Sequence, residues 1–444
     1  MKTDIVIKNC TVVNEEKITE RDVLIRDGRI EEVASEIGAE GKIIEASGLH
    51  LFPGVIDDQV HFREPGLTDR GNIKSESLAA IAGGTTSFMD MPNVLPPTLT
   101  NQLWNQKIEI ASTNASANYS FYMGSSNQNI EEIRSINPSE VCGVKVFMGS
   151  STGNLLVDNE ESLNLIFRDS PVLIATHCED TPMIKKAEAR FKAKYGEDIP
   201  IEAHSEIRSR EACLRSSKKA VALANKYDQN LHILHISTAD ELSLFSNKPI
   251  EEKLITAEVC VPHLYFNSED YQSKGSLIKC NPSIKLASDQ LALKDALKTG
   301  LIDFVATDHA PHVLANKDNS YMDCPSGMPS IEQTLIVVLE LVKNGSLSLK
   351  DVPNITSHNI AKRFKIKDRG FIREGYWADL VLVDLNDEHI IDDTKTNYAC
   401  GWSPFNGDKF SSKIVDTFVS GKHVFSRGKF LSTQQGKQLE FSRS

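Results

Sequence analysis

Eight short apolar segments read as buried strands, and helical stretches separate most of them along the chain. Alternation of strands and helices over eight units predicts a (β/α)8 barrel, because each parallel strand needs a crossover connection that returns the chain to the same end. We therefore expect an α/β fold with a TIM-type barrel over residues 53–368. The eight segments are VIDDQVH, TTSFMDM, NYSFYMG, GVKVFM, VLIATH, LHILH, KLITAEV and IDFVATD.

The two ends of the chain have a different texture from the middle. Short stretches of alternating apolar and polar residues fill both ends, and the dipeptides Asp27-Gly28 and Ser420-Gly421 are typical of tight hairpin turns. Because both ends are rich in strands, we expect residues 1–52 and 369–444 to assemble into one small β-sandwich domain beside the barrel.

Five of the predicted strands carry a side chain of interest at or just past their C-terminal ends. In a barrel these ends meet on one rim, where barrel enzymes place their active sites. Imidazole and carboxylate groups are ordinary zinc ligands, so the sequence predicts a metal centre on this rim that could serve a hydrolase. The five residues are His61, Lys145, His177, His235 and Asp308.

Lys145 does not fit a metal site in its ordinary form, because an ammonium group has no lone pair to donate to a cation. Addition of CO2 to the amine would give a carbamate, an anion whose two oxygens can bridge two metals. The alternative is a lysine that pairs with an acid or extends to solvent. Its place on a strand facing the other four residues favours the carbamate.

Composition excludes several classes of protein. The net charge of −12 gives nucleic acid or an anionic membrane no reason to bind, so an acidic small molecule must be held by local cations. No run approaches the ~20 apolar residues of a membrane span, and the first residues do not resemble a signal peptide. Eight cysteines without paired spacing indicate reduced thiols, and we expect a cytoplasmic protein.

A set of ordered motifs covers almost the whole chain, and together they resemble dihydroorotases of the amidohydrolase superfamily. Hydantoinases and allantoinases share the metal framework, but HFREPG, MPN and NPSIK resemble the substrate motifs of dihydroorotases in particular. The motifs are IDDQVHFREPG, MDMPNV, GVKVFMGSSTGN, THCED, LHISTAD, KCNPSIK, FVATDHAPH and GWSPFNG.

The resemblance implies an enzyme of pyrimidine synthesis that reversibly cyclises N-carbamoyl-L-aspartate to L-dihydroorotate. It implies one or two zinc ions, one held by His61 and Asp308 and the other by His177 and His235, with carboxylated Lys145 as the bridge. Asp308 would be the catalytic base and then the acid. We expect a homodimer or a higher homo-oligomer. The implied substrate-binding residues are His61, Arg63, Asn93, Asn281, His312, Ser326 and Gly327.

Gln59 departs from the family pattern, since most relatives have histidine at this position. An amide oxygen is a poorer zinc ligand than imidazole, so the role of Gln59 as a ligand is doubtful. Two alternatives stay open: a related cyclic amidohydrolase (dihydropyrimidinase, hydantoinase or allantoinase), or a non-catalytic dihydroorotase-like scaffold for a partner enzyme. Arg63 argues against the first alternative, because a ring without a carboxylate gives its guanidinium nothing to bind.

Three further features complete the sequence predictions. Strand alternation predicts that His232 faces the opposite side of its strand from His235 and packs outward from the barrel. Glu258, at the end of the seventh predicted strand, is expected to support the site without binding metal. The long connections 179–206 and 309–330 follow the fifth and eighth strands and are expected to be lids or binding loops.

Overall fold

A computed structural model describes residues 4–38, 40–149, 155–432 and 436–443 of the protein. Residues 150–154, the end of the motif GVKVFMGSSTGN, therefore lie outside the described residues. Every predicted barrel segment contains a strand. In chain order the barrel strands are β6 (Val55–Val60), β7 (Thr85–Asp90), β8 (Asn118–Phe121) with its continuation β9 (Met123–Gly124), β10 (Val144–Phe147), β11 (Ile174–His177), β12 (Leu231–Ile233), β13 (Ile255–Cys260) and β14 (Phe304–Ala306).

The barrel strands pair in parallel and in sequence order around a closed ring. Strands β6, β7 and β8 form one sheet, and strands β9 to β14 form another. The chain running from β8 into β9 joins the two sheets on one side. On the other side the N–H of His61 donates to the carbonyl of His309 at 2.7 Å, next to a parallel bridge between Val60 and His309. The predicted (β/α)8 barrel is confirmed.

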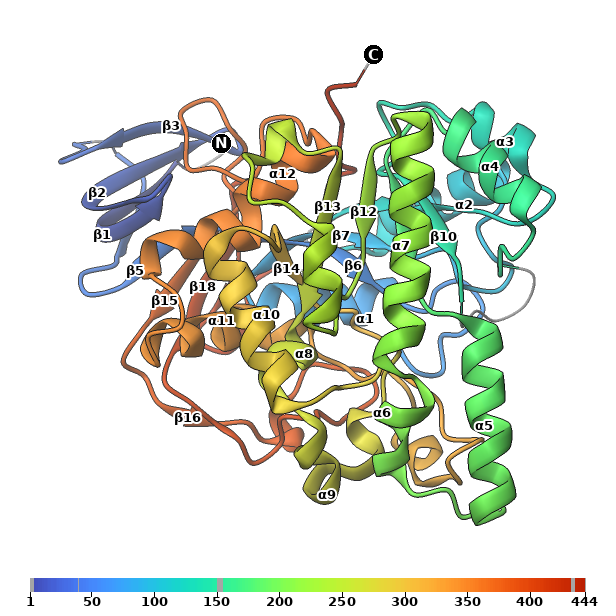
Figure 1. Ribbon diagram of the computed structural model, residues 1–444. Helices are drawn as coiled ribbons and strands as arrows, with labels where there is room; N and C mark the ends of the chain where they lie inside the picture. The colour runs from blue at the N-terminus through green and yellow to red at the C-terminus, as the bar shows by residue number, and fades with distance from the viewer. Residues whose placement is uncertain (1–3, 39, 150–154, 433–435, 444) are drawn as a thin grey trace.

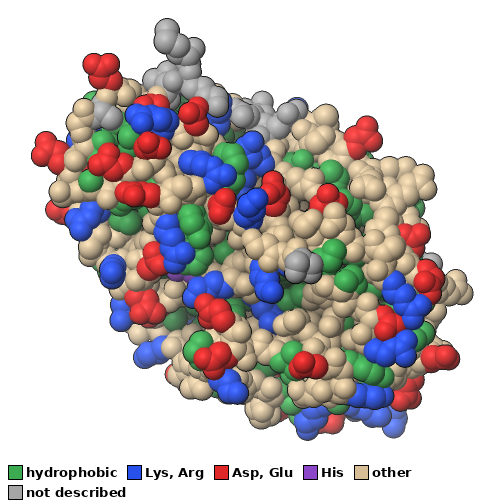
Figure 2. Space-filling model, turned by 90° about the horizontal axis from the view of Figure 1, so that it is seen from above, with side chains coloured by type: hydrophobic (Ala, Val, Ile, Leu, Met, Phe, Trp, Pro, Cys, Tyr) green, Lys and Arg blue, Asp and Glu red, His purple; other side chains and the backbone are tan. Residues whose placement is uncertain are grey.

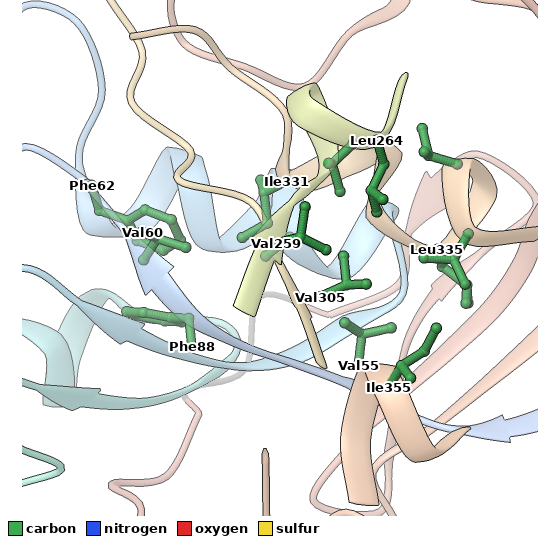
Figure 3. Close-up of a cluster of buried hydrophobic side chains, with 14 of the residues drawn as sticks. Val55, Val60, Phe62, Phe88, Val259, Leu264, Val305, Ile331, Leu335 and Ile355 are labelled. Carbon is green, nitrogen blue, oxygen red and sulfur yellow. The ribbon is translucent and has the colours of Figure 1, made fainter. Parts of the chain in front are cut away.

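Helices surround the barrel, and Figure 1 shows α5 and α7 along one side and α10 and α11 along another. The outward side chains of the strands pack against them, and Figure 3 shows Val259 and Val305 on the side of the barrel where Leu335 lies. The α-helices are α1 (Ile73–Ala82), α2 (Asn101–Asn114), α3 (Ile130–Arg134), α4 (Glu160–Asp169), α5 (Thr181–Tyr195), α6 (His204–Ile207), α7 (Arg210–Tyr227), α8 (Val261–Tyr265), α9 (Tyr271–Lys274), α10 (Ala287–Thr299), α11 (Thr334–Lys343) and α12 (Asn359–Phe364).

A separate sheet at one side of the barrel combines strands from both ends of the chain (Figure 1). Its strand order is β20-β19-β18-β15-β5-β1-β2-β3, with β4 paired to β1, and its apolar side chains form a core of their own. Both predicted hairpin turns are present, and their residues have the positive φ angles that such turns need. The strands are β1 (Ile5–Asn14), β2 (Lys17–Arg26), β3 (Arg29–Ala34), β4 (Lys42–Glu45), β5 (His50–Pro53), β15 (Leu380–Asp384), β18 (Lys413–Val419), β19 (Lys422–Ser426) and β20 (Lys429–Phe430).

The remaining C-terminal segments return to the barrel. The short strands β16 (His389–Ile390) and β17 (Lys409–Phe410) pair with each other, and the N–H of Leu439 donates to the carbonyl of Tyr119 on β8. The face in Figure 2 carries acidic and basic side chains in a mixture. None of the described helices has the length and apolar character that a bilayer crossing requires.

Candidate metal centre and substrate cavity

A cavity of about 100 Å³ lies at the C-terminal ends of the barrel strands. It brings together residues from seven of the eight strand units, although more than 240 positions separate the first from the last. His312 is the predicted site residue that does not line it. The predicted residues that line the cavity are Gln59, His61, Arg63, Asn93, Lys145, His177, His235, Asn281, Asp308, Ser326 and Gly327.

Three of these residues lie just past a strand end in a backbone conformation that side chains other than glycine seldom adopt. Their φ angles are +69° at Arg63, +41° at His235 and +49° at Asp308. Such conformations cost energy and are concentrated at functional sites, where the surrounding fold holds them. Here the turn directs each side chain back over the mouth of the barrel, which strand alternation alone does not predict.

Two pairs of donor atoms in the cavity are spaced as ligands of a shared metal ion. Nδ1 of His177 lies 3.0 Å from Nε2 of His235, and Nε2 of His61 lies 3.0 Å from Oδ1 of Asp308. Two ligands of a tetrahedral zinc, each bonded at about 2.0–2.1 Å, are roughly 3.3 Å apart. The donor types and their spacing therefore fit one ion at each pair.

The other ring nitrogens of two of these histidines have partners that fix their tautomers. Nδ1 of His61 lies 2.7 Å from Oδ1 of Asn93, and Nε2 of His177 lies 2.8 Å from Oε2 of Glu179. Both partners are acceptors, so these nitrogens carry the proton and the nitrogen that faces the other member of each pair keeps its lone pair. Arg208 pairs with Glu179 from behind. Glu179 lies within the motif THCED, which by itself predicts no role for this residue.

Lys145 is buried, with 1% of its surface exposed, and its amine lies 4.6 Å from the centre of the Phe147 ring. Within the described ranges no carboxylate lies at ion-pair distance from it. Burial lowers the pKa of Lys145 to about 8. The uncharged amine is the form that adds CO2, so this environment fits the predicted carbamate better than the alternative of a lysine paired with an acid.

Gln59 is held by two hydrogen bonds, and it directs its amide nitrogen, not its oxygen, at one of the donor pairs. Its amide nitrogen donates to Oδ1 of Asp308 at 3.2 Å, and its oxygen accepts from the thiol of Cys260 at 3.5 Å. The amide oxygen, the only atom of this side chain that could ligate a cation, is engaged away from Asp308. This arrangement agrees with the doubt that the sequence raised about Gln59 as a ligand.

Arg63 brings a buried positive charge to the wall of the cavity. Its side chain donates to the carbonyl of Pro311 at 3.2 Å, and among the described residues no carboxylate pairs with it. Burial lowers the pKa of Arg63 to about 10, so it stays charged at neutral pH. Asn281 adds a buried amide oxygen that has no hydrogen-bond partner in the part of the chain that is described. Both groups are available to a ligand.

His312 stands behind this wall and supports it. Its Nε2 lies 3.0 Å from the carbonyl oxygen of Ser326 and 3.1 Å from Nη2 of Arg63, while Arg70 approaches its Nδ1 at 3.4 Å. Burial, followed by the charge of Arg63, lowers the pKa of His312 to about 2, so the ring is neutral. With Arg70 facing Nδ1, the ring proton lies on Nε2 and is donated to the carbonyl of Ser326, so His312 holds Ser326 in place and packs beside Arg63 from outside the cavity.

Two buried lysines that no sequence motif indicates hold the connection that contains Ser326 and Gly327. Nζ of Lys279 donates to the carbonyls of Tyr321 and Cys324 at 2.5 and 2.6 Å. Nζ of Lys317 donates to the carbonyls of Pro325 and Gly327 at 2.9 and 3.0 Å, and more distantly to that of Lys279. The long connection 309–330 is thus tightly bound along this stretch.

By contrast, the connection 179–206 folds largely into α5 and the short helix α6.

The prediction that His232 points away from the barrel interior is wrong. Strand β12 ends at Ile233, so alternation does not extend from His232 to His235, and both side chains face inward. His232 is fully buried beside Asp58 and Glu258 and stacks on Phe304 at 4.7 Å between ring centres. Glu258 also accepts a hydrogen bond from the backbone N–H of His235 at 3.1 Å, which agrees with its expected supporting role.

Comparisons with known proteins give one consistent family. The model of the amidohydrolase family matches residues 50–424. A dihydroorotase of Methanosarcina acetivorans is 30% identical over 91% of this chain and 88% of its own length, and an allantoinase of Desulfitobacterium hafniense is 28% identical over 98% of both. The solved L-hydantoinase (dihydropyrimidinase) of Arthrobacter aurescens superposes with a TM-score of 0.94, at 26% identity, over 99% of this chain and 100% of that one.

Proposed function

The chain belongs to the amidohydrolase family, and we propose that within it the protein acts as a dihydroorotase, which reversibly cyclises N-carbamoyl-L-aspartate to (S)-dihydroorotate. The observation that carries this proposal is the unpaired guanidinium of Arg63 in the cavity wall. A buried cation needs a counter-charge, and the ring carboxylate of dihydroorotate supplies one. The uncharged rings of hydantoin and dihydrouracil do not.

In this proposal zinc would be held by the two donor pairs, His177 with His235 and His61 with Asp308, and carboxylated Lys145 would supply a further ligand to both. Zinc bound in this way would polarise the scissile carbonyl and make a water molecule acidic enough to attack at neutral pH. The spacing of the donor pairs and the buried, unpaired amine of Lys145 support this assignment.

The chain's own residues would carry the proton and fix the ring. In the hydrolytic direction Asp308 takes the proton of the attacking water and delivers it to the ring nitrogen that leaves. The hydrogen bond from Gln59 keeps the Asp308 carboxylate directed at the reacting atoms. Arg63 binds the carboxylate, and the free amide oxygen of Asn281 accepts a ring N–H.

A substrate panel measured beside metal content tests the proposal. We expect kcat/KM for dihydroorotate to exceed that for dihydrouracil, hydantoin and allantoin by orders of magnitude. A preference for a ring without a carboxylate would replace the proposal with a related cyclic amidohydrolase. Protein that binds zinc fully but turns over none of the four would instead be a non-catalytic scaffold.

A further inference from the structure

A second group of ligand-type side chains lies inside the barrel, below the cavity. Asp58 on β6, His232 on β12 and Glu258 on β13 are all fully buried. Nε2 of His232 lies 3.1 Å from Oε2 of Glu258 and 3.5 Å from Oδ2 of Asp58. One donor atom from each of the three lies within 4.8 Å of the others. None of these residues belongs to the donor pairs of the rim.

The hydrogen bonds of His232 determine what its Nε2 presents to the two carboxylates. Its Nδ1 lies 2.9 Å from the hydroxyl oxygen of Thr256, and that hydroxyl donates to the carbonyl of Leu231 at 3.4 Å. When that hydroxyl donates to Leu231, Nδ1 carries the proton of the neutral ring and Nε2 keeps its lone pair. The lone pair of Nε2 then faces one carboxyl oxygen of each acid, so three atoms of ligand type converge on one point.

The carboxyl group of Asp58 is the clearest sign that a proton or a cation belongs between these three side chains. Neither of its carboxyl oxygens has a hydrogen-bond partner among the described residues, although both are buried. The hydroxyl of Tyr122, on the third strand unit, is likewise buried and without a partner in the described part of the chain. A buried carboxylate without a partner strongly destabilises a fold, so Asp58 must be neutralised or bound.

We propose that Asp58, His232 and Glu258 form an internal site for a divalent transition-metal ion, separate from the metal centre at the rim. The separations of 3.1 and 3.5 Å bracket the roughly 3.3 Å expected between two ligands of tetrahedral zinc. One imidazole with two carboxylates suits Zn²⁺ better than Mg²⁺ or Ca²⁺, which prefer oxygen ligands alone.

The ion would serve a structural purpose. It would cross-link β6, β12 and β13 inside the barrel, on the side where the ladder closes. Because Glu258 also accepts from the N–H of His235, the internal site would hold the backbone of a rim ligand. This inference does not depend on which cyclic amide the enzyme hydrolyses.

The test combines anomalous diffraction with metal analysis on the full-length protein, produced with Zn²⁺ and freed of excess metal by gel filtration. In wild-type crystals we expect an anomalous zinc peak between the three side chains, in addition to the peaks at the rim. Asp58→Asn should lose one equivalent of zinc and that peak while keeping the rim peaks. Glu241→Gln is the matched control, because it neutralises a buried carboxylate whose partners are the hydroxyls of Ser217 and Thr238.

Wild-type crystals without the internal peak would overturn the proposal and indicate that the two carboxyl groups share a proton instead. This measurement needs no variant, so it decides the matter even if Asp58→Asn does not fold. Equal zinc content in Asp58→Asn and wild type would overturn it as well. Turnover of dihydroorotate is assayed separately, so failure of the proposed function leaves this result unaffected.

Discussion

The strand side of the cavity, with the two donor pairs, is built on strands and the residues directly past their ends, whereas the loop side, with Ser326 and Gly327, depends on one connection, residues 309–330 between β14 and α11. His177 ends β11 and pairs in register with Phe147 on β10, so ladder hydrogen bonds hold its backbone on a central strand. Ser326 and Gly327 have no such ladder. Their connection is held by the ammonium groups of Lys279 and Lys317, which donate to its carbonyls from inside the protein.

This contrast shows two ways of making a rigid site. A strand satisfies its backbone with other strands, and a point mutation of one side chain leaves that framework intact. The connection instead depends on buried charges, and among the described residues neither lysine has a carboxylate within ion-pair distance. With Arg63 they place three buried cations near the cavity of a chain whose net charge is −12. The loop side is therefore both a wall of the cavity and a source of positive potential at it, which would attract the anionic substrate that we propose.

The largest effect is expected on the strand side, at Lys145. Lys145→Ala should lose most bound zinc and nearly all turnover of dihydroorotate, because the bridging carbamate is gone while the strands remain. Short-chain carboxylic acids added to the variant should partly restore both by replacing the carbamate oxygens. Metal analysis with steady-state kinetics measures this, and full zinc content in the variant would contradict the bridging role.

Arg63→Met should have the next largest effect, this time on substrate and not on metal. Loss of a charge-assisted contact to a carboxylate costs about 2–4 kcal/mol, or about 30- to 1,000-fold in kcat/KM for dihydroorotate. Zinc content should not change. Arg70→Met is a suitable control, because Arg70 contacts His312 but does not line the cavity. Near wild-type activity in Arg63→Met would contradict carboxylate binding and favour a hydantoinase-like substrate.

Lys317→Met tests whether the buried lysines hold the loop side. It removes the donor to the carbonyls of Pro325 and Gly327. Leaving a buried carbonyl without a partner costs about 1–3 kcal/mol of the free energy that holds the connection in its native conformation. We expect kcat/KM for dihydroorotate to fall about 5- to 150-fold with unchanged zinc content. The exposed Lys350→Met should have no effect. A loss of zinc in Lys317→Met would mean that the two sides of the cavity are not independent.

A smaller effect is expected from pH, which should change the charge of the lysines on the loop side and thereby KM for dihydroorotate. Burial lowers the pKa of both Lys279 and Lys317 to about 8, so their positive charges disappear as the pH rises through 8. KM for dihydroorotate should therefore rise above pH 8, and this rise should be smaller in Lys317→Met. The folded protein holds these protons less tightly than the unfolded chain, so between about pH 8 and the usual lysine pKa of about 10.4 their contribution to the free energy of unfolding increases with pH. A KM independent of pH from 7 to 9.5 would contradict this electrostatic role.

The same contrast explains what could be predicted from the sequence. Strand-end residues such as His61 and His177 follow from the eightfold pattern, because parallel strands bring their C-terminal ends together whatever the loops do. Lys279 and Lys317 could not be found this way, because their partners are backbone carbonyls and carry no sequence signal. His232 was misplaced because alternation was extended beyond the end of β12. The support that Glu179 gives His177 depends on a side-chain contact that spacing alone does not reveal.

The smallest effect is expected at Gln59, where this chain differs from the family pattern. Gln59 donates to Asp308 and accepts from Cys260, so its removal should loosen the Asp308 carboxylate without removing a metal ligand. We expect Gln59→Ala to keep its zinc and to lose only a few-fold in kcat, in contrast to His61→Ala, which should lose zinc from the pair that His61 forms with Asp308. Gln59→His should bind zinc more tightly at that pair, since imidazole is a better zinc donor than an amide, but its turnover need not rise because Asp308 loses its hydrogen bond. Zinc titration of the three variants measures this, and a loss in Gln59→Ala as large as that in His61→Ala would make Gln59 a full ligand of the strand side.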